Sequence, residues 1–145
     1  MKLFVLSAAM LGATAMAGAA QPLYQSPEPP EAGLWVPTIV SVPQGESRDA
    51  AFSIIVRNVD SALAANLSVS VSPNPSRRDA GVLSLAGDTC TGATLARHGD
   101  CRLRFDARAA CGKPGSTTWF VTVNPASGAP VTTQVQVANK TGKCE

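Results

Sequence analysis

The chain has 145 residues, and its 12 Lys and Arg residues against 10 Asp and Glu residues give a formal net charge of +2. This near-neutral balance argues against a nucleic-acid-binding protein, whose affinity comes mainly from clustered basic charge. The length is that of one domain, and a chain of this size buries enough surface for a substantial core.

The first 20 residues have the layout of a secretory signal peptide. Lys2 supplies a positive start, residues 3–11 form a short apolar core, and small residues continue to Ala20. A membrane anchor is the alternative, but Gly12 and Thr14 interrupt the apolar stretch, which is shorter than the ~20 residues that a span requires. We therefore expect no membrane span in the mature chain, a periplasmic or secreted location, and cleavage after Ala17, Ala19 or Ala20.

Residues 21–33 follow as a proline-rich arm. The charged and proline residues of this segment are Pro22, Pro27, Glu28, Pro29, Pro30 and Glu31. Proline removes backbone donors and favours extended polyproline conformations, so we expect an exposed, flexible arm. It is either a spacer or donor strand for a neighbour, or a disordered leader.

Period-two alternation of apolar and polar residues dominates residues 34–145 and predicts half-buried strands. Leu67, Val69 and Val71, for example, alternate with serines. Proline and glycine turns separate seven such runs, at 34–42, 51–58, 66–72, 82–86, 101–106, 117–124 and 131–137. Seven short strands at this spacing predict an all-β, immunoglobulin-like sandwich of two sheets over residues 34–145.

Two residues stand out from this regular pattern. Pro37 lacks a backbone donor, which places the first run at a sheet edge. Ile55 breaks the alternation of 51–58, in which Phe52, Ile54 and Val56 share one face.

Residues 87–105, GDTCTGATLARHGDCRLRF, resemble a recurring piece of bacterial choice-of-anchor D domains, which are similar to the abnormal-spindle and Hydin type of immunoglobulin-like domain. That pattern has a cysteine, a few small residues, Leu-Ala-x-Gly, a second cysteine and an alternating strand that ends in Phe. Here the glycine is displaced by one residue, to Gly99, and Arg97 and His98 stand where proline is usual. The resemblance implies an immunoglobulin-like fold and a disulfide between Cys90 and Cys101. It implies little about activity, because such a fold hosts many functions.

Four cysteines indicate disulfides, because an exported protein matures in an oxidising compartment. We favour Cys90 with Cys101, as the resemblance implies, and Cys111 with Cys144, which is one of the three connectivities that four cysteines allow. The alternative is that Cys144 crosslinks a second chain. A zinc site is disfavoured because there is no CxxC pair and the only histidine is His98.

No motif in the sequence predicts catalysis. A catalytic base needs a nucleophile and an orienting group within hydrogen-bond reach, and the sequence around His98 offers no recognisable pattern that supplies them. No nucleophile elbow, calcium loop or phosphate-binding glycine motif is present either. We therefore interpret His98 as a solvated loop residue and expect no catalytic residue, no metal site and no cofactor.

A local basic strip is formed by four arginines, Arg97, Arg102, Arg104 and Arg108. Arg102 and Arg104 share the outward face of one predicted strand, and guanidinium groups suit carboxylates, which favours docking of an acidic partner. The alternative is that the neighbouring Asp100 and Asp106 neutralise the strip.

The aromatic residues divide between core and surface. Trp35 and Trp119 are typical of a sandwich core, and Trp119 is in phase with Val121 and Val123. Phe120 points to the opposite face. Together with Arg102 and Arg104, it is our candidate interface residue.

These observations favour an exported binding or assembly module of the cell envelope or cell surface, such as a subunit of an extracellular complex or filament. Its partner would be another protein or a second copy of the chain, and not nucleic acid. The alternative is a periplasmic chaperone or inhibitor that acts through strand-edge pairing, which is natural for a sandwich with exposed edges. Because no catalytic motif is present, we expect that the chain is not an enzyme.

Overall fold

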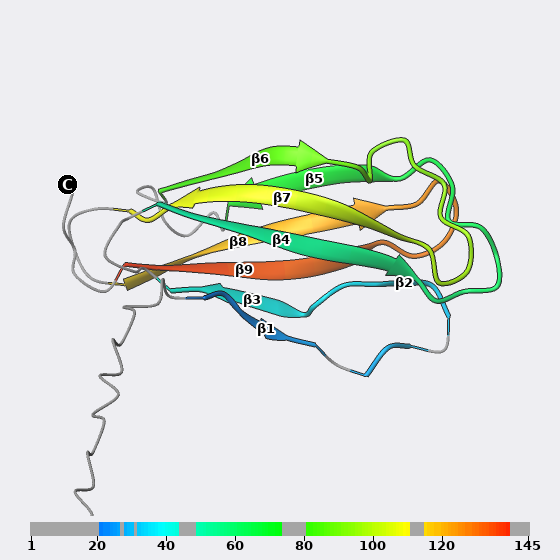
Figure 1. The fold of residues 1–145 in the computed structure, drawn as a ribbon, viewed down its shortest axis with the longest axis horizontal. Helices are drawn as coiled ribbons and strands as arrows, with labels where there is room; N and C mark the ends of the chain where they lie inside the picture. The colour runs from blue at the N-terminus through cyan, green and yellow to red at the C-terminus, as the bar shows by residue number, and fades with distance from the viewer. Residues whose placement is uncertain are drawn as a thin grey trace, which may run out of the picture.

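A computed structural model describes residues 21–26, 28–30, 32–43, 49–73, 81–110 and 115–139. These residues contain no helix and form the strands β1 (Leu23–Gln25), β2 (Leu34–Trp35), β3 (Ile39–Val42), β4 (Asp49–Asn58), β5 (Ser68–Pro73), β6 (Val82–Asp88), β7 (Asp100–Arg108), β8 (Gly115–Asn124) and β9 (Val131–Asn139). The strands make two sheets that pack face to face (Figure 1). The predicted all-β, immunoglobulin-like sandwich is therefore confirmed.

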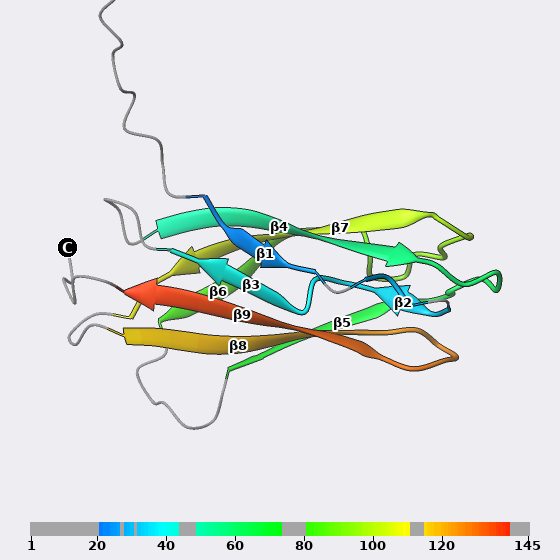
Figure 2. The same ribbon diagram turned by 90° about the horizontal axis from the view of Figure 1, so that it is seen from below.

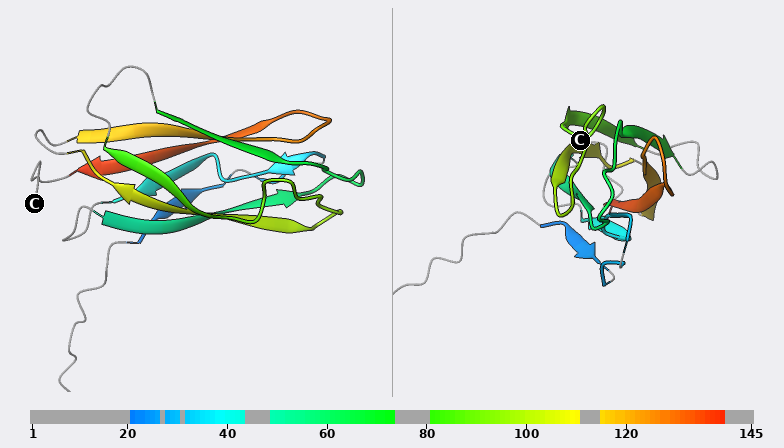
Figure 3. Two further views of the ribbon diagram at one scale, coloured as in Figure 1. Left: turned by 90° about the horizontal axis from the view of Figure 1, so that it is seen from above. Right: turned by 90° about the vertical axis from the view of Figure 1, so that its right-hand side faces the viewer.

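The two sheets differ in strand number and in the direction of one pair. Sheet A has the order β1-β3-β9-β8-β5, and sheet B has the order β2-β4-β7-β6. Neighbouring strands run antiparallel except β3 and β9, which run parallel with Val40 beside Val135. Seen along the long axis, the strands surround a central core and β1 lies on its outside (Figure 3).

The core is built from the inward positions of the period-two pattern. In β7 the alternation is complete, because Cys101, Leu103, Phe105 and Ala107 are buried while the residues between them are exposed. Phe105 stacks on Phe52 of β4 with their ring centroids 5.4 Å apart. This alternation leaves the other face of β7 free to carry charged side chains.

The run 34–42, predicted as one strand, is two strands that belong to different sheets. β2 pairs with β4 in sheet B, and β3 pairs with β9 in sheet A, so the chain crosses between the layers at residues 36–38. Pro37 explains the break, because its ring fixes φ and it has no backbone donor for a ladder. Its carbonyl accepts a hydrogen bond from the Thr133 hydroxyl, which ties the crossing to β9. β2 lies at a sheet edge as Pro37 predicted, whereas β3 lies between β1 and β9.

The strand β1 lies in the arm, which the sequence predicted to be exposed and flexible. It runs antiparallel to β3 with Tyr24 beside Val40, and the two strands lie side by side in Figure 2. Leu23 is 68% exposed and Tyr24 is 44% exposed, so apolar burial contributes little to this strand. β1 is held by its backbone pairing with the edge of β3, because backbone groups at a sheet edge pair with a further strand regardless of side-chain pattern.

Strand β6 is less regular than the run 82–86 predicted. Of the two leucines in that run, Leu83 is buried and Leu85 is 39% exposed. A register shift between Leu85 and Gly87 interrupts the pairing with β7. Because β6 is the last strand of sheet B, no further strand covers its outer side within the described residues.

Candidate functional site

A disulfide fastens the connection between β6 and β7. Cys90 and Cys101 are bonded with their Cα atoms 5.1 Å apart, and both residues are buried. In the same connection, the Gly92 N–H donates a hydrogen bond to the Leu67 carbonyl at 2.7 Å. The predicted Cys90–Cys101 pairing is confirmed. Cys111 and Cys144 lie outside the described residues, so their pairing stays a prediction.

Asp88 shapes the turn that presents Cys90 to Cys101. Its Oδ1 accepts hydrogen bonds from the backbone N–H of Cys90 at 2.7 Å and of Thr91 at 2.9 Å, and its Oδ2 accepts one from the Thr91 hydroxyl. Burial raises the pKa of Asp88, but these three hydrogen bonds together outweigh it and hold the pKa below the ordinary value of 3.8. The charged form of Asp88 therefore stabilises the folded chain.

The contribution of Asp88 to stability should depend on pH. Because the folded-state pKa lies below 3.8, the contribution is fully present above that value and is lost as pH falls through the folded pKa. Asp88→Asn keeps the shape and removes the charge, so the variant should be less stable than the original chain near neutral pH. The difference should shrink as the pH is lowered. Urea unfolding of both chains across acidic and neutral pH measures it, and a gap that stays constant with pH would show that the charge is irrelevant.

Asn58, at the end of β4, holds the loops at one end of the sandwich together. Its side chain is 1% exposed and donates from Nδ2 to the carbonyls of Ala62 at 2.8 Å and Leu95 at 2.9 Å. Its Oδ1 accepts from the Asp60 N–H at 3.0 Å. The backbone of Asn58 also bonds to His98 N–H and to the Gly99 carbonyl. One buried amide therefore connects the loop after β4 with the loop before β7.

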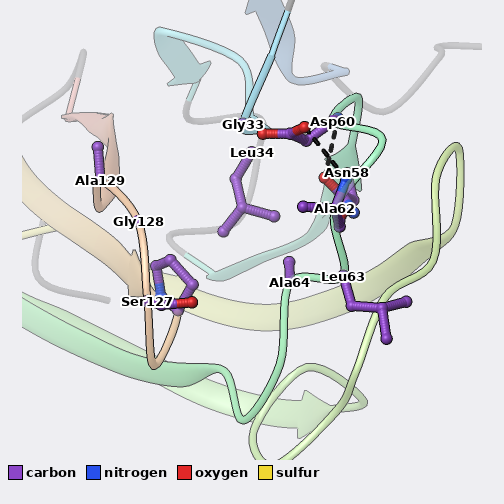
Figure 4. A pocket seen from close by; sticks show the side chains of 11 residues that line it. Gly33, Leu34, Asn58, Asp60, Ala62, Leu63, Ala64, Ser127, Gly128 and Ala129 are labelled. Atoms are coloured by element: carbon purple, nitrogen blue, oxygen red, sulfur yellow. Dashed lines mark hydrogen bonds between the residues drawn. The ribbon is translucent and has the colours of Figure 1, made fainter.

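A hollow of about 200 Å³ lies beside Asn58 (Figure 4). Its lining comes from three segments of the chain, 33–34, 58–64 and 125–129. Asp60 accepts hydrogen bonds from Ala62 N–H at 3.1 Å and from the Ser61 hydroxyl at 3.4 Å, and the Ala62 bond is the main cause that lowers the pKa of Asp60. The Asn58 and Asp60 side chains, which Figure 4 shows here, are thus bonded within the loop, so their role is to hold the loop's shape.

His98 and Arg97 lie on the loop that Asn58 anchors. Both residues are exposed, and His98 has a left-handed backbone with φ of 62°. The exposure agrees with the interpretation of His98 as a solvated loop residue. Arg97 is on this loop and not on a strand, so it does not extend the row formed by Arg102 and Arg104.

The outer face of sheet B carries the group that we name the arginine face, which consists of Ser53, Ile55, Arg102 and Arg104. The register of β4 and β7 places Ser53 opposite Arg104 and Ile55 opposite Arg102. Directly opposite residues have Cβ atoms about 5 Å apart. Ile55, the residue that broke the sequence pattern, is 39% exposed here. The face therefore combines two guanidinium groups with one apolar side chain.

The arginines of sheet B differ in their ionic partners. Arg57 lies 3.5 Å from the Asp100 carboxylate, and Arg108 lies 3.3 Å from the Asp49 carboxylate. Asp100, which we had considered as a counter-charge for the strip, is thus used by Arg57. Across the described ranges, no carboxylate forms an ion pair with Arg102 or Arg104. These two guanidinium groups are available to an outside partner.

The arginine face borders an open stretch of the β4 edge. Asn58 directs its backbone N–H and C=O toward the β7 side, because they bond Gly99 and His98. Along an antiparallel strand, the N–H and C=O groups of successive residues point to alternate sides. The backbone groups of Ala51, Ser53 and Ile55 therefore point away from β7. On that side β2 pairs only with Arg57 and Asn58. Among the residues described, the one group that reaches this stretch is the Tyr24 hydroxyl, which donates to the Ser53 carbonyl at 2.9 Å.

The predicted aromatic residues lie elsewhere. Phe120 belongs to β8 of sheet A, where it faces Ser72 and Gln134 in the register, so it is not brought together with Arg102 and Arg104. Trp119 is partly buried against the core, and Trp35 is half-buried. The sequence did not indicate Ser53 or Tyr24 as site residues, and the exposed Ile55 was the one available signal.

No family model matches the chain, and no curated protein matches its sequence. The solved structures that resemble it include the secreted serine protease VesC from Vibrio cholerae, with a TM-score of 0.57 and 16% identity over 73% of this chain. The VesB protease of Vibrio cholerae has a TM-score of 0.52 and 17% identity, also over 73% of this chain. The ASH/PapD-like domain of human CEP192 has a TM-score of 0.44 and 11% identity over 88% of this chain and 95% of its own.

The chain spans less than a third of the two proteases, 23% of VesC and 32% of VesB. At such low identity the likeness shows the fold alone. It nevertheless contradicts our prediction that the chain is not an enzyme, because the same fold occurs within proteins that are described as proteases. The physical reason is that a sandwich supports many functions, so neither the fold nor a missing motif in this segment excludes an activity.

Proposed function

We propose that the chain is an exported binding module that engages a protein partner through the arginine face, as part of an envelope or cell-surface complex. The observation that carries this proposal is the contrast between the arginines of sheet B. Arg57 and Arg108 each have a carboxylate within 3.5 Å, whereas Arg102 and Arg104 form no ion pair among the described residues. Guanidinium groups bind carboxylates with two parallel hydrogen bonds, so a partner with acidic side chains fits this face.

Export is supported by the signal-peptide pattern of residues 1–20 and by the buried Cys90–Cys101 disulfide, since such bonds persist in oxidising compartments. The described residues also include no helix that is long and apolar enough to cross a bilayer. The signal-peptide pattern and the disulfide support a periplasmic or extracellular location for the mature module.

Crosslinking in the native envelope tests the proposal. A photoreactive residue in place of Ile55 on the arginine face should form an adduct with a partner protein. The same residue in place of Ser70, which is exposed on β5 of the other sheet, should not. Arg102→Ser with Arg104→Ser should reduce the adduct at position 55 by at least about tenfold, because each charge-assisted hydrogen bond contributes about 1.5 to 3 kcal/mol.

The control for this experiment is the double variant Arg97→Ser with Arg108→Ser. It removes the same amount of charge from positions that do not belong to the arginine face. It should leave the adduct unchanged. If both double variants reduce the adduct equally, the chain binds through its overall charge and the proposal is wrong.

A second candidate function is strand-edge pairing with a client, in the manner of a chaperone or an inhibitor. It is supported by the stretch of β4 from Ala51 to Ile55, which has no paired strand in the described part of the chain. An edge of this kind accepts an extended segment through main-chain hydrogen bonds.

A further inference from the structure

We propose that the partner contributes an extended segment that adds to β4 as a new edge strand of sheet B. Two acidic side chains of this segment, on alternate positions, would bind Arg102 and Arg104. The inference rests on the proposed function, since it specifies the chemistry of the partner at the same face. It joins two independent features of the described residues, a backbone edge with no paired strand and a pair of arginines without carboxylate partners.

The backbone of β4 supplies the first feature. The N–H and C=O groups of Ala51, Ser53 and Ile55 point away from β7, and no described strand pairs with them. An added strand would form main-chain hydrogen bonds with these groups. These bonds give affinity independently of sequence, so the selectivity must come from side chains.

Strand spacing brings the arginines within reach of the added segment. Neighbouring strands lie about 4.8 Å apart, so the added strand would lie about 10 Å from β7. The side chain between them opposite Arg104 is Ser53, which is too short to separate a glutamate on the new strand from the guanidinium group. Ile55, opposite Arg102, is 39% exposed and would pack against the stem of the second acidic residue.

The charges of β7 fix the register of the segment. Opposite Ala51, Ser53 and Ile55, β7 presents Asp106, Arg104 and Arg102 in that order. Acidic residues are therefore favoured beside Ser53 and Ile55, and an acidic residue beside Ala51 would be repelled by Asp106. Because side chains alternate between faces with period two, the acidic pair must be at positions i and i+2. The occupant is thus an extended acidic peptide segment and not a diffuse anionic surface.

Tyr24 occupies part of this site in the free chain. Its hydroxyl donates to the Ser53 carbonyl at 2.9 Å, and an added strand would need that same carbonyl. Strand β1 would therefore compete with the partner. Removing the hydroxyl should make binding easier.

A labelled peptide probe tests the inference on the full mature chain. The probe is a fluorescein-labelled, amidated heptapeptide of sequence Thr-Val-Glu-Val-Glu-Val-Thr, whose two glutamates share one face of a strand. Its matched control, Thr-Val-Glu-Glu-Val-Val-Thr, has the same composition but directs the glutamates to opposite faces. We expect anisotropy titrations to show at least about tenfold tighter binding of the probe, since one guanidinium contact is lost in the control.

Variants of β4 separate strand addition from simple charge attraction. Ser53→Pro removes an N–H that faces the open side and breaks no hydrogen bond to β7, and proline is tolerated at strand edges. It should weaken probe binding by about tenfold relative to Ser53→Ala. Tyr24→Phe should tighten binding by about fivefold. In case Ser53→Pro does not fold, amide exchange of the unmodified chain gives a second readout: the Ala51, Ser53 and Ile55 amides should become protected by the probe.

The outcomes distinguish this inference from the proposed function. If Arg102→Ser with Arg104→Ser abolishes binding, but Ser53→Pro binds normally and the three amides stay unprotected, the arginine face binds acids without strand addition and the inference is wrong. If the probe and its control bind equally and the arginine variants have no effect, the proposed binding face is wrong as well.

Discussion

Replacing Asn58 with alanine is expected to lower the free energy of unfolding by roughly 2 to 4 kcal/mol. The side chain makes three hydrogen bonds, two from Nδ2 and one to Oδ1, at distances between 2.8 and 3.0 Å. It is 1% exposed, so water does not easily replace these bonds, and the Leu95 carbonyl would lose its side-chain donor. Unsatisfied buried polar groups cost about 1 to 3 kcal/mol each, which makes this a severe substitution.

Asn124→Ala is the matched control, because Asn124 ends β8 as Asn58 ends β4 but is only partly buried. Its loss should change the free energy of unfolding by less than about 1 kcal/mol. Urea unfolding followed by tryptophan fluorescence measures both variants. Equal effects of the two substitutions would mean that Asn58 does not anchor the loops.

Replacing Cys90 and Cys101 together with alanine is expected to lower the free energy of unfolding by roughly 3 kcal/mol. The bond closes a loop with a sequence separation of 11 residues, and it restricts the unfolded chain by an amount that depends on this loop length. The variant should also loosen the arginine face. Thr89, next to Cys90, donates from its N–H to the Arg102 carbonyl at 3.0 Å and accepts from the Arg102 N–H at 2.8 Å.

Reductant separates the two predicted disulfides. Unfolding of the original chain should become easier when reductant is added, and the double alanine variant should lose the part of that response that belongs to Cys90 and Cys101. Any response that remains in the variant reports on Cys111 and Cys144. If reductant destabilises the variant and the original chain equally, the Cys90–Cys101 bond contributes no stability and the prediction is wrong.

The period-two alternation of apolar and polar residues predicted most of the strands. β7 was predicted residue by residue, because Cys101, Leu103 and Phe105 alternate with charged residues and the strand is covered on one face only. The disulfide followed from the resemblance of residues 87–105. The prediction that the chain is not an enzyme failed for a different reason: it inferred an absence of activity from missing motifs, and sandwiches of similar fold occur within proteases.

The candidate site was only partly visible in the sequence. Arg102 and Arg104 were placed on one outward face by their spacing. That they have no ionic partner among the described residues depends on Arg57 of β4, which pairs with Asp100. Phe120 was grouped with them because it also points outward, yet it belongs to the other sheet. Alternation tells which side of its own strand a residue takes, and it does not tell which sheet the strand joins.

The sequence by itself therefore determined the strand content, the buried face of β7 and the charges exposed on it, because these depend on neighbours along one strand. Only the tertiary structure decided that the chain changes sheets at Pro37, that β1 pairs with β3, and that no described strand pairs with β4 beside the arginines. These features depend on backbone hydrogen bonds between segments far apart in the chain. Backbone N–H and C=O groups are the same in every residue type but proline. The side-chain pattern therefore does not predict which strand edges pair with one another.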